Sequence, residues 1–112
     1  YFTYARTEKD QSDTRTIQTL KGIIENQNTS QENKDKATEE YTRLTTNQKY
    51  ETSIELSLKG KGYKDVLCFI ENQQARVYIK TSEKLTQKQV AQIQEVITSI
   101  SQIKDVVIEE KE

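Results

Sequence analysis

Hydrophobic residues are scattered through the first quarter of the chain and become periodic only near the end of that stretch. Residues 1–28 are polar and rich in Thr, Gln, Asp and Asn. Their apolar positions, which show helical spacing only late, are Tyr4, Ile17, Leu20, Ile23 and Ile24. The pattern predicts a frayed or solvated helical arm that becomes regular from about Arg15 to Asn26, with a loop over residues 26–30.

A long second helix is predicted to follow. Thr29, with Glu32 three positions later, fits a capping box, in which the two side chains satisfy backbone donors at the helix start. The apolar stripe of this helix comprises Ala37, Tyr41, Leu44, Tyr50, Ile54 and Leu58. Polar residues 45–48 interrupt the stripe, so the first half should project beyond the core. Gly60 and Gly62 should end the helix because glycine adopts positive φ at no steric cost.

Beyond Tyr63 the pattern becomes that of strands. Residues 66–70 form a short apolar run, residues 71–74 fit a hairpin connection, and residues 75–80 alternate with a period of two. This alternation predicts a core face that carries Ala75, Val77 and Ile79.

The third helix has the clearest start signal. Thr86 and Gln89 fit a second capping box, and Leu85 and Val90 are placed for a hydrophobic staple around it. The buried stripe is predicted to be Val90, Ile93, Val96, Ile97 and Ile100, closed by Ile103. Residues 106–108 predict a third strand.

The element order after the arm is therefore αββαβ. Two amphipathic helices can cover one face of a three-stranded sheet, which predicts a two-layer α+β domain. The hairpin and the third helix each reverse the chain, so the third strand should run parallel to the second. Its neighbour in the sheet could be either the first or the second strand. We expect an arm over residues 1–28 and a folded domain over residues 29–112.

The composition excludes several classes of function. Lys and Arg (17) and Asp and Glu (18) give a net charge of −1, without the basic surplus that nucleic-acid binding requires. There is no His, and the single Cys68 lies in an apolar run, where it is interpreted as a small core residue. The adjacent carboxylates Glu39/Glu40 and Glu109/Glu110 cannot converge on one point. No catalytic residue is predicted.

No metal, phosphate or cofactor site is predicted. Carboxylates alone remain as ligands, and no spacing of Asp and Glu resembles a calcium loop. The Gly60-Lys61-Gly62 sequence follows a helix and lacks the longer glycine frame of a phosphate loop. RNA-binding KH domains share the αββαβ order but use a GXXG loop, which does not occur here.

The first residues raise the question of a membrane anchor. The chain opens Tyr1-Phe2-Thr3-Tyr4 and contains no Met, so we expect it to be a fragment of a longer protein. Three aromatic residues in four positions fit the interfacial belt that follows a transmembrane helix. They equally fit a helix start with exposed aromatics. Within the chain no apolar run approaches the length that spans a membrane.

Surface residues are the remaining candidates for function. If the helices cover one face of the sheet, then Leu67 or Phe69, beside Arg76 and Tyr78, would be exposed as an apolar contact patch. The other possibility is that the strand at residues 66–70 is central and that the arm covers this face.

Two groups of opposite charge form a second candidate interface. The cationic group is Lys59, Lys61 and Lys64, and the acidic group is Asp105, Glu109, Glu110 and Glu112. A ring requires a head-to-tail contact between two different patches, and this pair could supply it. The same side chains could also be ordinary solvated charges.

The residues from Ile54 to Val66 carry a resemblance to a known family. The second helix ends in L-x-x-K-G-Y, the third helix fits L-T-x-x-x-V-x-x-I from Leu85, and the last strand is rich in valine. In this arrangement the chain resembles the stage III sporulation protein AH family over about residues 38–110. The resemblance implies the ring-building fold that this family shares with basal-body proteins of secretion systems and flagella.

The resemblance also implies a function. The full-length protein would be anchored by one N-terminal helix in the mother-cell membrane around the forespore. Its domain would lie between the two membranes, bind the forespore protein SpoIIQ and help to form a ring-like channel. No catalytic residue or cofactor is implied. A KH-like nucleic-acid-binding module and a soluble adaptor without a membrane role are the alternatives.

Overall fold

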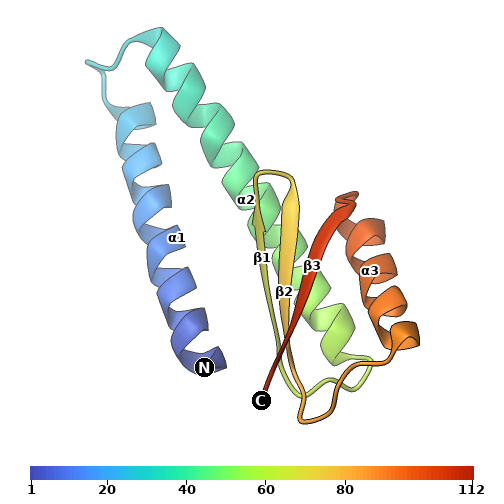
Figure 1. Cartoon of the computed structure of the whole chain (residues 1–112). Helices are drawn as coiled ribbons and strands as arrows, with labels where there is room; N and C mark the ends of the chain where they lie inside the picture. The colour runs from blue at the N-terminus through green and yellow to red at the C-terminus, as the bar shows by residue number, and fades with distance from the viewer. The chain divides into compact units, whose positions relative to one another are not determined.

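The computed structural model describes residues 1–112, which form two compact units over residues 1–46 and 47–112 (Figure 1). The element order is α1, α2, β1, β2, α3 and β3. Helix α2 (Gln31–Lys59) contributes its first part to one unit and its last part to the other. None of the helices is both long and apolar enough to cross a membrane.

The first unit consists of α1 (Phe2–Glu25) and the beginning of α2. Helix α1 is continuous from Phe2, so the prediction that it becomes regular only near Arg15 is wrong. Within this unit the ammonium group of Lys21 lies 6.0 Å from the ring centroid of Tyr41, an arrangement that stabilises helix pairs through cation–π attraction. Leu20 is buried, although the arm was predicted to be frayed or solvated.

The cap of α2 corrects the predicted start of this helix by one residue. The Ser30 Oγ atom accepts a hydrogen bond from the Asn33 N–H group at 3.2 Å, so Ser30, and not Thr29, is the N-cap. The capping box of Thr29 with Glu32 is therefore wrong. The preceding loop sets this register, because the Asn26 side chain accepts from the Asn28 N–H group at 2.9 Å and fixes a tight turn before the helix.

The second unit contains a mixed three-stranded sheet. Its strands are β1 (Val66–Glu71), β2 (Gln74–Lys80) and β3 (Asp105–Lys111), in the order β1-β2-β3. Strand β2 pairs antiparallel with β1 and parallel with β3. The predicted direction of the third strand is confirmed, and its neighbour is β2. The possibility that β1 is the central strand is wrong.

Residues with positive φ explain two of the connections. Asn72 and Gln73 have φ values of 52° and 62°, as a two-residue type I′ hairpin turn requires. Gly62, three residues after α2 ends at Lys59, has a φ of 109°, which only glycine adopts readily. The predicted hairpin connection and the predicted end of the second helix thus both coincide with turns.

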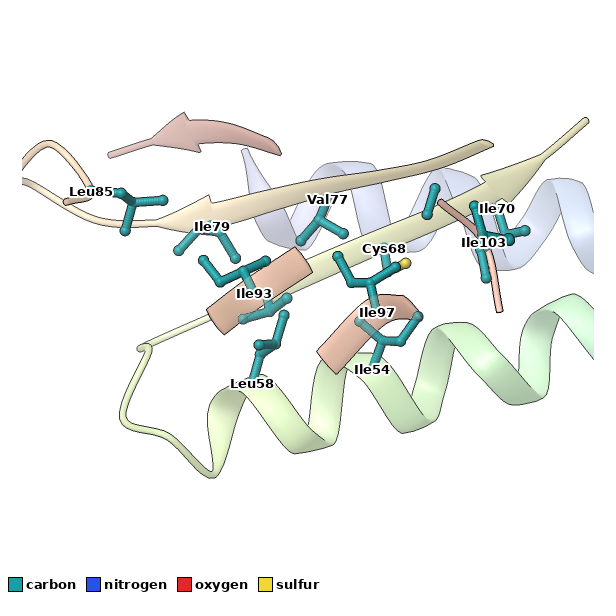
Figure 2. Packing of buried hydrophobic residues seen from close by; sticks show 12 residues of the cluster. Ile54, Leu58, Cys68, Ile70, Val77, Ile79, Leu85, Ile93, Ile97 and Ile103 are labelled. Atoms are coloured by element: carbon teal, nitrogen blue, oxygen red, sulfur yellow. The ribbon is translucent and has the colours of Figure 1, made fainter. Parts of the chain in front are cut away.

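The hydrophobic core of the second unit lies between one face of the sheet and two helices. Helix α3 (Gln87–Ser101) begins with the predicted capping box of Thr86 and Gln89. Figure 2 shows Ile54 and Leu58 of α2 and Ile93 and Ile97 of α3 directed toward the strands, and these four side chains are fully buried. Val90, Val96 and Ile100, which were predicted in the buried stripe, are only partly buried. The predicted two-layer α+β fold is confirmed.

Candidate protein-interaction surfaces

The β1 edge of the sheet is closed by two carboxylates of α2. Glu55 Oε2 accepts from the Cys68 N–H group at 2.8 Å, and Glu51 Oε2 accepts from the Ile70 N–H group at 2.7 Å. One helical turn between Glu51 and Glu55 advances about 6 Å, and two strand residues advance about 6.7 Å, so the two spacings match. The outward donors of β1 are therefore satisfied without a fourth strand.

Sequence reasoning missed this role of α2. Glu51 and Glu55 are one turn apart and flank Ile54 and Leu58 on the helix surface. A pair of acids beside a buried stripe was the available signal, but the same spacing is common on solvated helices.

Strand β3 forms the other edge of the sheet, and no further strand pairs with it. The Thr81 N–H group donates to the Lys111 carbonyl, which shows that odd-numbered residues of β3 direct their backbone groups toward β2. Val106, Ile108 and Glu110 consequently direct their N–H and C=O groups outward. The apolar residues of this strand, Val106, Val107 and Ile108, are all partly exposed.

The sheet face opposite the helices carries four of the predicted candidates. Leu67 is 1% exposed, so the expectation that it belongs to an exposed patch is wrong. Phe69 is partly exposed and packs edge-to-face on Tyr78, with ring centroids 5.8 Å apart. Arg76 forms an ion pair with Glu109 at 3.3 Å. Without Leu67 the candidate surface consists of Phe69, Arg76 and Tyr78, which the pairing of β1 with β2 brings together.

The predicted cationic group lies on the connection between α2 and β1. Lys59 forms an ion pair with Asp65 at 3.4 Å, and Lys61 and Lys64 are exposed. Lys61 also lines a groove with residues of α2 and α3, which include Glu95 and Ile100. Lys61 and Lys64 are thus the more accessible cations of this group.

The structure separates the predicted acidic group. Asp105 begins β3 and accepts from the Gln74 amide, whereas Glu109 and Glu110 lie at the other end of the strand. Glu110 Oε1 accepts from the Leu85 N–H group at 2.7 Å and so holds the loop that leads into α3. Since Glu109 is paired with Arg76, the terminal Glu112 is the more accessible carboxylate at this end.

The side chains with potential chemistry lie apart. Cys68 is fully buried in the core, as expected for a packing residue. Burial raises the pKa of the Tyr63 phenol, which moves its titration further from neutral pH. No three His, Cys, Asp or Glu side chains are grouped so that they could hold a metal ion.

The fold and these surfaces define the chain as an α+β protein with a helical lead-in and a small mixed sheet that has one covered and one open edge. It belongs to the SpoIIIAH-like family, whose model matches residues 1–109. This match confirms the resemblance found in the sequence.

A solved structure shows the same fold along nearly the whole chain. It is described as the structure of the SpoIIQ–SpoIIIAH pore-forming complex, and one of its chains is similar to this one with a TM-score of 0.89 and 22% identity. The similarity covers 98% of this chain and 96% of that chain. No curated protein matches the chain.

Proposed function

We propose that this chain is a non-catalytic assembly domain of a sporulation channel and that it binds a SpoIIQ-like protein of the forespore. The observation that carries the proposal is the extent of the likeness to the chain from the SpoIIQ–SpoIIIAH complex, which includes both compact units. The backbone that a partner would contact in either unit therefore has a counterpart in the chain from that complex.

The KH-like alternative is not favoured. The chain has no GXXG loop, and its net charge is −1. A generic adaptor role would not explain why the family model extends through α1 as well as through the αββαβ domain.

The binding test is a calorimetric titration of this chain with the SpoIIQ-like protein of the same organism. We expect saturable binding with one site per chain. A parallel titration with single-stranded RNA should be flat at low and moderate salt. Absence of binding to the SpoIIQ-like protein, or RNA binding that weakens with salt, would refute the proposal.

The proposal places the domain in the space between the mother-cell and forespore membranes, held by an N-terminal anchor in the mother-cell membrane. Family membership supports this location. In sporulating cells sampled before the mother-cell membrane has closed around the forespore, a cysteine introduced at exposed Ser12 of the full-length protein should react with a membrane-impermeant maleimide. Protection of that cysteine until the membranes are permeabilised would contradict the location.

We further propose that Lys61 and Lys64 contribute to a head-to-tail contact between copies in a ring. Exposed charge pairs contribute under about 1 kcal/mol each, so they should orient subunits more than hold them. Copies of this domain should therefore associate only when a membrane or partner concentrates them.

The assembly test compares two pairs of charge reversals on lipid-tethered protein. Lys61→Glu with Lys64→Glu should reduce assembly, whereas Lys84→Glu with Lys88→Glu, at exposed positions before and in α3, should not. Adding Glu112→Lys to the first pair should restore part of the assembly. Equal behaviour of the two pairs would exclude this contact.

A further inference from the structure

The two edges of the sheet differ in whether their outward backbone groups have partners. Glu51 and Glu55 occupy the outward donors of β1, which prevents another strand from pairing there. At β3 the chain supplies no strand, and three consecutive apolar residues remain partly exposed. Proteins normally blunt such an edge with charged side chains, Pro or a bulge. In β3 the charged residues stand at the two ends of the strand, and its centre, Val106, Val107 and Ile108, has none of these devices.

We infer that the β3 edge accepts an extended strand from a different protein, so that the sheet continues from this chain into its partner. This inference rests on the proposed function and specifies how the partner is held. Backbone groups of Val106, Ile108 and Glu110 would supply the hydrogen bonds, as in strand addition to an open sheet edge.

Antiparallel pairing with β3 of a second copy is unfavourable at this edge. With the even-numbered residues directed outward, antiparallel self-pairing that includes at least five residues of β3 can be centred on residue 107, 108 or 109. Centring on 107 sets Asp105 opposite Glu109 of the other copy, and centring on 109 sets Glu109 opposite itself. Like charges directly opposite each other destabilise a strand pair.

The register centred on residue 108 fails for another reason. It gains a pair between Asp105 and Lys111, but it also sets Glu110 opposite Val106 and Glu109 opposite Val107, each twice. A carboxylate opposite a valine is a poor cross-strand pair. The strand that fits must carry apolar residues opposite the valines and basic residues opposite Glu109 and Glu110, so it comes from another protein.

The first experiment measures amide hydrogen exchange by NMR, free and with the SpoIIQ-like protein. The amides of Val106, Ile108 and Glu110 should exchange rapidly in the free chain and at least about tenfold more slowly in the complex. The amides of Val107 and Glu109, which face β2, should be protected in both states and serve as internal controls. Binding that leaves the three outward amides unprotected would overturn the inference.

The second experiment separates the backbone from the side chain at one position. Ile108→Pro removes the outward donor, and Ile108→Ala keeps that donor while it shortens the side chain. Partner affinity should fall about tenfold or more beyond the effect of Ile108→Ala. Equal affinities of the two folded variants would overturn the inference. If Ile108→Pro does not fold, an ester in place of the residue 108 amide, introduced by ligation at Cys68, gives the same comparison with the side chain intact.

The two proposals fail in different ways. If the unmodified chain does not bind the SpoIIQ-like protein at all, the proposed function is wrong. If it binds and the outward amides remain unprotected, only the strand-addition inference is wrong.

Discussion

Glu51 is an acidic side chain in the interior of a very polar chain. Its exposure is 6%, and its Oε2 atom accepts from the buried Ile70 N–H group at 2.7 Å. A backbone donor left buried without an acceptor costs about 1–3 kcal/mol. Glu51 therefore stabilises the domain by satisfying the Ile70 donor of β1.

Replacement of Glu51 tests this role. Glu51→Leu should lower the free energy of unfolding by about 1–3 kcal/mol in urea denaturation, because the Ile70 donor loses its acceptor. Glu51→Gln retains an acceptor oxygen and should lose less. Glu39→Leu, at an exposed position of the same helix, is the control. Glu51→Leu with unchanged stability would show that water or a rearranged side chain replaces the carboxylate.

Ile97 represents the apolar residues whose burial was predictable. It is fully buried between α3 and the sheet (Figure 2). Ile100 in the same stripe is partly exposed. Ile97→Ala should lower the free energy of unfolding by about 2–5 kcal/mol through lost transfer energy and a cavity. Ile100→Ala should have a smaller effect. A loss under about 0.5 kcal/mol for Ile97→Ala would place this residue outside the core.

At the scale of elements, helix caps provide a direct comparison of two similar signals. Ser30→Ala and Thr86→Ala should each lower stability by about 0.5–2 kcal/mol, because each side chain accepts an N–H group at a helix start. Thr29→Ala should change stability by less than about 0.5 kcal/mol. Thermal denaturation of the three variants measures this order, and a larger loss for Thr29→Ala than for Ser30→Ala would restore the original cap prediction.

The predictability of an element depended on how local its signals are. The cap of helix α3 and the burial of Ile93 and Ile97 were predictable because the capping box and the centre of the apolar stripe lie within one segment. The start of α2 was misplaced by one residue because Thr29 and Ser30 are both good caps and the Asn26 turn decides between them. Residues 1–14 have no apolar stripe, so their continuous helix could not be read from hydrophobic periodicity.

At the scale of the whole molecule, the strand order and the edges were beyond sequence reasoning. The period of two identified the core face of β2 but did not determine whether β1 or β3 lies beside it. The contrast between the covered and the open edge arises from contacts between α2 and β1 that are 13 and 19 residues apart. The sequence therefore predicted that the function lies in surface contacts, but the open β3 edge could be located only from the fold.

The parallel pairing of β2 and β3 also determines the order in which the sheet can assemble during folding. Cys68 pairs with Val77 nine residues on (77 − 68 = 9), whereas Val77 pairs with Ile108 31 residues on (108 − 77 = 31). Closing the shorter loop loses less chain entropy, so the hairpin should form first and β3 should dock last. Until β3 docks, the edge of β2 that pairs with β3 is exposed and could pair with strands of other molecules. In stopped-flow kinetics, Val66→Ala should slow folding, and Val106→Ala should mainly speed unfolding. The reverse partition would mean that β3 belongs to the folding nucleus.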